Sequence, residues 1–189
     1  MHTVWTTEEI IENLPYALTK AQQNVWHEIE RDLSGHGLMS RLVQGDVGSG
    51  KTAVAAALCW QAAKNGMQAA LMAPTELLAR QHFATLSSFF RDTDVRPVLL
   101  TGSTPKKERT AILEALADGS ASIAVGTHAL LSEGVTFSRL GLAVTDEQHR
   151  FGVAQRSALA GKGDSPHLLV MSATPIPRTL NMAPVSYTH

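Results

Sequence analysis

Short apolar runs alternate with helical patterns along most of this chain, and this alternation restricts the fold more than any other feature. Apolar runs that lack an alternating polar face are typical of strands buried on both sides. Such runs occupy residues 41–44, 69–73, 98–101, 122–125, 142–145 and 168–171. Because helical patterns separate them, the sequence predicts an α/β domain with a mostly parallel sheet covered by helices on both faces.

Capping and breaking residues predict where the helices begin and end. An alanine-rich helix over residues 51–65 ends before Gly66, and Thr75 caps the helix that follows the strand at 69–73. Thr104 followed by proline predicts the cap of a later helix, which closes at Gly119. The helix after Thr75 keeps an apolar face made of Ala79, Phe83, Leu86 and Phe90.

Composition narrows the class of protein. With 189 residues the chain is long enough for one sizeable domain, and its formal net charge of −1 means that any contact with nucleic acid has to be local. The single cysteine, Cys59, allows no internal disulfide, which fits a reducing compartment. The longest apolar run falls far short of the roughly 20 residues that span a bilayer. Without a signal-peptide pattern or a membrane span, we expect a cytoplasmic protein.

Residues 45–52 read GDVGSGKT and fit the phosphate-loop pattern, in which glycines let backbone N–H groups surround a triphosphate at a helix N-terminus. A flexible surface loop that happens to contain a lysine is the alternative, and the strand before and the helix after favour the phosphate loop. In this interpretation the lysine reaches the β- and γ-phosphates and the threonine hydroxyl binds Mg²⁺. The candidate nucleotide ligands are Gly45, Asp46, Val47, Gly48, Ser49, Gly50, Lys51 and Thr52.

Two acidic residues follow the apolar run at 142–145. Asp146 is placed to hold Mg²⁺, largely through water, and Glu147 to orient and deprotonate the attacking water. An acidic pair after a strand is common on a protein surface, so this interpretation depends on the phosphate loop in the same chain. Together the two motifs predict Mg·ATP binding and phosphoryl transfer to water.

Gln148 and His149 complete an Asp-Glu-Gln-His motif, which resembles that of superfamily-2 helicases and translocases. The resemblance implies a RecA-like P-loop NTPase domain and a catalytic role for His149. It also implies that Gln22 reads adenine while Tyr16 stacks on the base. Coupling of hydrolysis to domain movement would involve Gln148, Ser172 and Thr174. The implied DNA contacts are Pro74, Thr75, Gln81, Thr101, Gly102, Gly126, Thr127 and His128.

Four segments narrow the resemblance to the RecG family of branched-DNA helicases: residues 14–19, 44–52, 146–153 and 173–180. The transcription-repair coupling factor shares parts of the last two but usually has glutamate where this chain has Gln148, although Asn181-Met182 is closer to the coupling factor. Glu76 stands where many superfamily-2 proteins have arginine and RecG-like proteins have glutamate. A coupling-factor-like translocase, a stand-alone P-loop NTPase and a non-catalytic nucleotide-binding module stay open as alternatives.

The resemblance implies ATP and Mg²⁺ as cofactors and forked or branched DNA as the partner, in the cytoplasm at the bacterial nucleoid. It also implies a second RecA-like domain and an N-terminal wedge domain, for which this chain has no sequence. We therefore expect a partial chain that lacks turnover alone. Its expected parts are a helical lead-in over residues 1–34, the motor domain over 35–183, and a non-native tail over 184–189.

Overall fold

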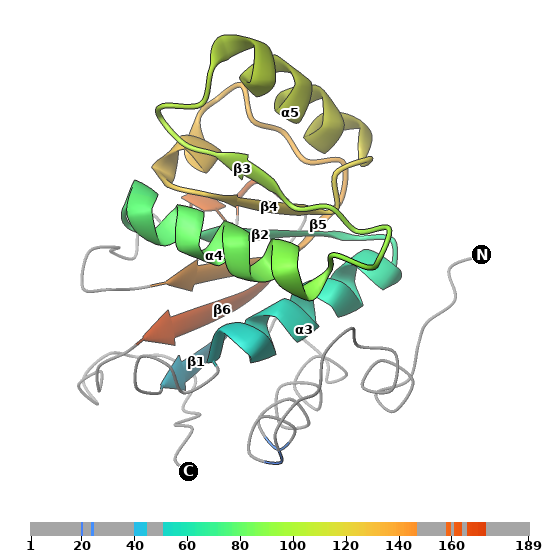
Figure 1. The fold of residues 1–189 in the computed structure, drawn as a ribbon, viewed down its shortest axis with the longest axis vertical. Helices are drawn as coiled ribbons and strands as arrows, with labels where there is room; N and C mark the ends of the chain where they lie inside the picture. The colour runs from blue at the N-terminus through green and yellow to red at the C-terminus, as the bar shows by residue number, and fades with distance from the viewer. Residues whose placement is uncertain are drawn as a thin grey trace.

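A six-stranded sheet organises the computed structural model, which describes residues 20, 24, 40–44, 51–146, 158–159, 161–163 and 166–172. The strand order is β1-β6-β5-β2-β4-β3, and every neighbouring pair is parallel (Figure 1). The strands are β1 Ser40–Gln44, β2 Gln68–Met72, β3 Val98–Leu100, β4 Ile123–Gly126, β5 Leu140–Asp146 and β6 His167–Ser172. The predicted parallel α/β sheet is confirmed.

Helices connect the strands, as the alternation predicts. They are α3 Lys51–Lys64, α4 Glu76–Phe89, α5 Lys106–Asp118 and the short 3-10 helix η1 His128–Leu131. None of the helices among the described residues has the length and apolar character that crossing a bilayer requires. The expected lead-in lies outside the described residues except for Lys20 and Asn24, which are helical, and the expected tail lies entirely outside them.

Most of the predicted helix ends are confirmed. Gly66 and Gly119 follow α3 and α5 with φ angles of 76° and 86°, a left-handed conformation that glycine adopts without strain. Thr75 caps α4, since its hydroxyl oxygen accepts a hydrogen bond from the backbone N–H of Leu78 at 3.2 Å. Of the predicted Thr104-Pro105 cap of α5, Pro105 is the N-cap residue, but the Thr104 hydroxyl makes no cap: it accepts from the backbone N–H of Thr101 at 2.9 Å and closes the preceding turn.

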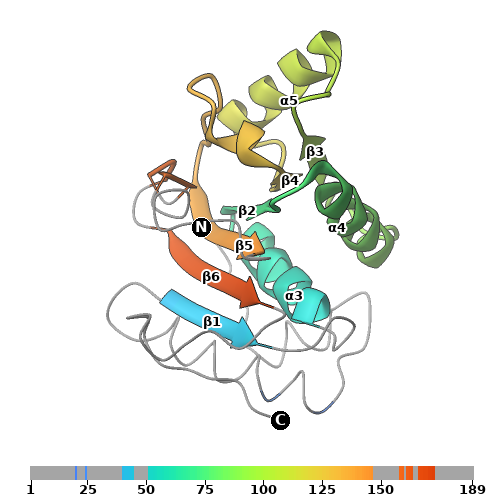
Figure 2. The same ribbon diagram turned by 90° about the vertical axis from the view of Figure 1, so that its left-hand side faces the viewer.

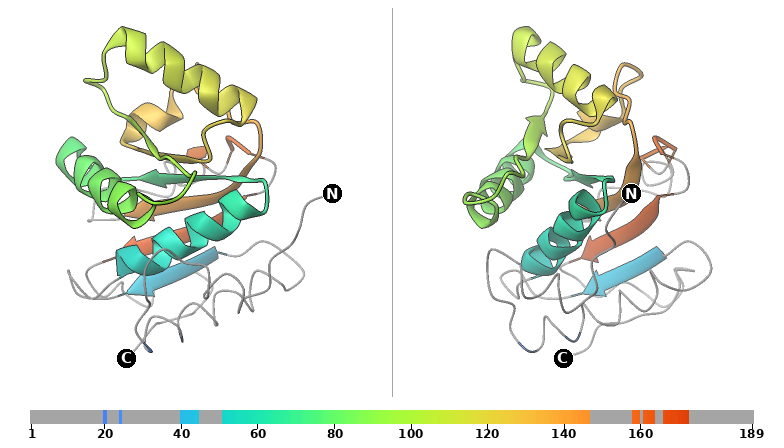
Figure 3. Two further views of the ribbon diagram at one scale, coloured as in Figure 1. Left: turned by 45° about the vertical axis from the view of Figure 1, so that its right-hand side comes forward. Right: turned by 90° about the vertical axis from the view of Figure 1, so that its right-hand side faces the viewer.

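The two faces of the sheet carry separate apolar clusters, because successive strand residues point to opposite sides. Helices α3 and α4 lie side by side on one face (Figure 3) and pack on Leu71, Ile123, Val144 and Leu169. On the other face α5 and η1 contribute to a second cluster with Ala70, Met72, Ala124 and Ala143. Helices therefore cover both faces, as predicted.

Helix α3 is the most deeply buried helix of the described part. Burial raises the pKa of the Cys59 thiol to about 12. The Trp60 ring stacks on Phe90 with centroids 5.5 Å apart, and the Lys64 ammonium lies 4.5 Å from the centre of the tryptophan ring. The stacking of Trp60 on Phe90 joins α3 to the end of α4.

Candidate nucleotide and nucleic-acid site

The carboxyl edge of the sheet collects the candidate nucleotide residues that the structure describes. Strands β1, β6 and β5 are neighbours and point the same way, so their carboxyl ends meet at one edge (Figure 2). Helix α3 begins at Lys51, and Thr52 in its first turn is half-buried. Asp146 ends β5 at that same edge. In open α/β sheets this edge is where ligands bind.

Asp146 is a buried carboxylate at this edge. Its side chain is 3% exposed and lies on the face of β5 that α3 and α4 cover, in step with Leu142 and Val144. One carboxylate oxygen, Oδ2, lies 2.7 Å from Nε2 of His82 on α4. The other oxygen, Oδ1, is buried and has no hydrogen-bond partner among the described residues.

An unpartnered buried carboxylate oxygen fits a magnesium ligand. Mg²⁺ prefers oxygen and is usually held by one or two carboxylates together with substrate phosphates and water. Within the described residues no group of three or more His, Cys, Asp or Glu side chains is arranged to hold a metal ion by itself. The hydroxyl of Thr52 and the carboxylate of Asp146 therefore fit the chemistry of a metal that arrives with a nucleotide, such as Mg·ATP.

The sequence patterns did not identify His82. The predicted apolar face of α4 runs through Ala79, Phe83, Leu86 and Phe90, and the structure buries Ala79, Leu86 and Phe90. His82 is also buried, three residues after Ala79 and four before Leu86. The available signal was this polar residue at a core position of the helix, but its partner is 64 residues away in the sequence.

The ends of β3 and β4 form a second polar region, built around Glu76 at the start of α4. The hydroxyl of Thr101 donates to Oε1 of Glu76 at 2.7 Å, the Ser103 hydroxyl donates to the same atom, and Arg80 pairs with it at 3.2 Å. These bonds, led by those of Ser103 and then Thr101, hold the pKa of the Glu76 carboxyl below its usual range. Glu76 thus fixes the loop 101–104 against α4.

The candidate DNA contacts divide by exposure. Thr75, Gln81, Gly102 and His128 are exposed, and Pro74 is half-buried. Thr101, Gly126 and Thr127 are buried. The hydroxyls of the two buried threonines are engaged within the chain, that of Thr101 with Glu76 and that of Thr127 with the backbone N–H of Ala129 at 3.4 Å.

Gly126 has a packing reason to be glycine. A Cβ at this position would overlap the carbonyl oxygen of Leu100 on β3 and would lie 2.9 Å from Cγ of Leu130. Gly102 differs, because nothing among the described residues lies within 4 Å of a Cβ built there. Packing therefore explains why position 126 is a glycine, but it does not explain the glycine at position 102.

Several predicted site residues lie outside the described residues. They are Tyr16, Gln22, the glycine stretch from Gly45 to Gly50, Glu147, Gln148, His149 and Thr174. Of the coupling residues, Ser172 is described in its backbone, where it ends β6 and pairs with Gln44 of β1. Its place at the carboxyl edge brings it near the end of the strand that precedes the glycine stretch.

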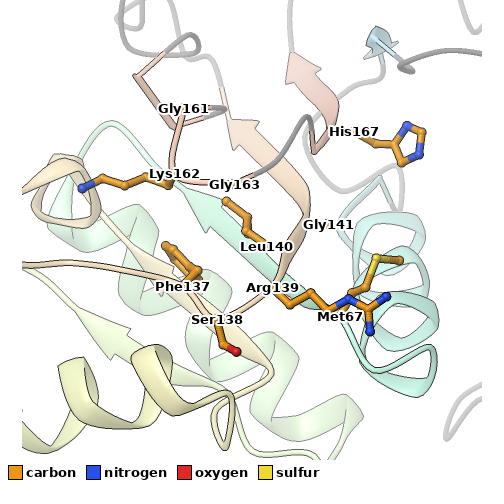
Figure 4. Close-up of a pocket in the computed structure, with 10 residues that line it drawn as sticks. All are labelled: Met67, Phe137, Ser138, Arg139, Leu140, Gly141, Gly161, Lys162, Gly163 and His167. Carbon is orange, nitrogen blue, oxygen red and sulfur yellow. The ribbon is translucent and has the colours of Figure 1, made fainter. Parts of the chain in front are cut away.

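A cavity of about 580 Å³ opens at the opposite, amino edge of the sheet. Figure 4 shows its lining residues, which include Met67, Arg139, Lys162 and His167. The Lys162 ammonium is engaged there, since it donates to the carbonyl oxygens of Ser132 and Val135 at 2.7 and 2.9 Å. The cavity lies at the opposite end of the strands from Asp146, so it is separate from the candidate nucleotide site.

Comparison with known proteins agrees with this geometry. A sequence model of the DEAD/DEAH box helicase family matches residues 19–183 of the chain. The chain belongs to the DEAD/DEAH box helicase family. This helicase domain is 50% identical over 179 residues to the ATP-dependent DNA helicase RecG of Streptococcus pneumoniae and 55% identical over 170 residues to that of Bacillus subtilis.

The same relatives are much longer than this chain. The matched part covers 93% and 90% of this chain but only 26% and 25% of those two relatives, so the chain spans about a quarter of their length. A solved structure of RecG bound to a three-way DNA junction superposes with a TM-score of 0.77 at 43% identity, over 92% of this chain and 23% of that one.

A more distant neighbour supports the fold alone. The crystal structure of a DEAD box protein from Methanococcus jannaschii has a TM-score of 0.67 at 22% identity, over 86% of this chain and 46% of that one. These structural neighbours are RecA-like helicase domains, as the sequence predicted.

Proposed function

We propose that this chain binds Mg·ATP and is the first motor domain of an ATP-dependent helicase that remodels forked or branched DNA in recombination and repair. The observation that carries the proposal is the carboxyl edge, where α3 begins shortly after β1 and the buried carboxylate of Asp146 ends β5, with only β6 between these two strands. The high identity to proteins named ATP-dependent DNA helicase RecG supports the same function.

The candidate nucleotide residues are proposed to have the following roles in binding and phosphoryl transfer. Lys51 neutralises the β- and γ-phosphates, while Glu147 orients the attacking water and takes its proton, assisted by His149. Thr52 and Asp146 would hold Mg²⁺, which would supply stabilisation of the charge on the transferred phosphoryl group. The backbone N–H groups of the loop 45–50 bind the phosphates, and Tyr16 and Gln22 bind the adenine.

DNA contact is proposed through phosphates and not through base edges. The exposed candidates Thr75, Gln81, Gly102 and His128 suit this role, since hydroxyl, amide and backbone N–H groups are common phosphate partners. Contacts at the buried positions 101, 126 and 127 would come from backbone groups. A formal net charge of −1 agrees with DNA contacts that are confined to a few local groups.

The complete motor requires parts beyond this chain. In two-domain motors ATP lies between two RecA-like domains, and an arginine from the second domain stabilises the transition state. We propose that a second RecA-like domain and a DNA-wedge domain accompany this domain in a longer protein. Gln148, Ser172 and Thr174 would then couple hydrolysis to movement between the two RecA-like domains, in the bacterial cytoplasm at the nucleoid.

The test measures nucleotide binding and turnover on the same preparation. We expect the chain to bind fluorescent Mg·ADP, to hydrolyse ATP at background rate with or without forked DNA, and to lose nucleotide binding in Lys51→Ala. Lys64→Ala, at the far end of the same helix, is the matched control and should retain binding. Rapid turnover that Lys51→Ala abolishes would show a site complete in this chain and would contradict the half-motor proposal.

A further inference from the structure

His82 is a buried polar residue for which the proposed function gives no role. The residues that α4 buries are Ala79, His82 and Leu86, a spacing that places them on one face of the helix. Ala79 and Leu86 pack into the core, where an apolar residue between them would serve equally well. A histidine at that position needs a different explanation, because burying its polar nitrogens has a cost unless they are hydrogen-bonded.

The partner of His82 is the candidate magnesium ligand. Nε2 of His82 and Oδ2 of Asp146 are 2.7 Å apart, and the two side chains are 10% and 3% exposed. An ionised Asp146 can only accept hydrogen bonds, so Nε2 carries the hydrogen of this bond. Hydrogen bonds to an ionised group are shorter and stronger than neutral ones, and shielding from water strengthens them further.

The bond also defines the orientation of the carboxylate. The donor belongs to a helix that is capped by Thr75 and anchored by Leu86, so its position is fixed relative to β5. With Oδ2 held by His82, rotation of the Asp146 carboxylate is restricted, and Oδ1 stays without a partner among the described residues. One oxygen is therefore anchored and the other is left available.

We propose that His82 is a positioning residue that orients Asp146, so that Oδ1 is the oxygen offered to Mg²⁺ of the bound nucleotide, directly or through water. The inference rests on the proposed Mg·ATP function of this edge. Partners that orient a ligating side chain affect metal affinity by about 10- to 100-fold in other metal sites. His82 would thus act on the metal without touching it.

A purely structural role makes a different prediction. If the bond served only to join α4 to β5, its loss would lower the stability of the fold but leave the metal affinity of the folded chain unchanged. Leu86→Ala supplies the matched control, since Leu86 is an apolar residue buried on the same face of α4, one turn further along, and has no polar atom to offer Asp146.

The experiment uses Mn²⁺ as a spectroscopic probe in place of Mg²⁺. Mn²⁺ binding to the chain–ADP complex is titrated by electron paramagnetic resonance, ADP affinity is measured separately in EDTA, and the melting temperature is recorded for every variant. The variants are His82→Leu, His82→Asn and His82→Gln. The glutamine amide nitrogen reaches about as far as Nε2 of histidine, whereas that of asparagine stops short, so the two amides differ in reach at similar polarity.

We expect His82→Leu and His82→Asn to weaken Mn²⁺ binding about tenfold or more, with ADP affinity in EDTA unchanged. His82→Gln should recover most of the lost Mn²⁺ affinity because it restores a donor to Oδ2. Leu86→Ala should lower the melting temperature while Mn²⁺ affinity stays at the wild-type value. If His82→Leu fails to fold, the contrast between asparagine and glutamine carries the test.

Two results would overturn the inference while leaving the proposed function intact. One is wild-type Mn²⁺ affinity in both His82→Leu and His82→Asn, and the other is an equal loss in the asparagine and glutamine variants. A wild-type chain that binds neither ADP nor Mn²⁺–ADP would instead overturn the proposed function, and the inference with it.

Discussion

Two carboxylates at the carboxyl edge, Asp146 and Glu76, are both contacted by residues of α4 but are held in opposite ways. The Glu76 side chain is 41% exposed, and its Oε1 accepts from Thr101, Ser103 and Arg80. The Asp146 side chain is 3% exposed, has His82 as its one partner among the described residues, and keeps a buried oxygen without one.

The difference distinguishes a carboxylate that holds a loop in place, Glu76, from one that fits the proposed ligand site, Asp146. Glu76 lies where water is available and still gathers several donors, so it serves the shape of the loop 101–104. Asp146 lies where an unmet acceptor costs free energy, about 1–3 kcal/mol for a typical buried polar group. A fold tolerates such a cost at functional positions, where stability and activity are in conflict.

The largest effect is expected from a substitution that tests how tightly the strand ends near Glu76 are packed. Gly126→Ala should lower the free energy of unfolding by about 3 kcal/mol, because the new methyl group would overlap the carbonyl oxygen of Leu100. Gly102→Ala is the matched control and should stay within about 0.5 kcal/mol of wild type. Urea denaturation followed by circular dichroism measures both. Equal losses of stability in the two variants would mean that packing does not distinguish Gly126 from Gly102.

The next effect tests the conflict at Asp146. In the absence of nucleotide and metal, Asp146→Asn should raise the free energy of unfolding by about 1 kcal/mol, since a neutral amide is easier to bury than a carboxylate and can still accept from His82. The same variant should lose the Mg²⁺ dependence of ADP binding. Thermal melts and ADP titrations with and without Mg²⁺ measure the two quantities. A destabilised Asp146→Asn would remove the contrast with Glu76.

The smallest effect has the opposite sign. Glu76→Gln should lower the melting temperature slightly at neutral pH, since hydrogen bonds from Ser103 and Thr101 favour the charged carboxylate. The pKa of Glu76 is lowered in the folded chain, so its stabilisation is present above the ordinary glutamate pKa of about 4.3 and is lost as the pH falls through the lower folded value.

Melting curves between about pH 6 and pH 3 measure this contribution. The difference in melting temperature between wild type and Glu76→Gln should shrink toward the acid end. A difference that stays constant across this range would show that the charge of Glu76 does not stabilise the loop.

The sequence predicted the strands well, because continuous apolar runs such as 69–73 and 142–145 match β2 and β5 within two residues at each end. The predicted cap at Thr75 is confirmed, whereas the Thr104 hydroxyl does not cap α5 because it accepts from the backbone N–H of Thr101 instead. Periodicity and turn chemistry are local, and those predictions succeed when no tertiary partner competes.

The site was predicted only in part, for the same reason. A strand-end position identified Asp146, but its bond to His82 depends on how α4 is placed over β5, which no local pattern encodes. The sequence also did not indicate which candidate DNA contacts are exposed. Thr101 and His128 both belong to motifs of the candidate DNA surface, but only His128 faces solvent. The roles of the residues outside the described part stay predictions.

The position of β1 has a consequence for the order in which the domain is assembled. β1 lies at the sheet edge, and its one neighbour in the described sheet is β6, with Ser40 opposite Leu168. Such distant pairings form slowly because a long loop must close first. Within the described sheet, the strand that leads into residues 45–52 therefore gains its neighbour only after β6 has been synthesised, and we expect nucleotide to stabilise the nascent domain only from that point.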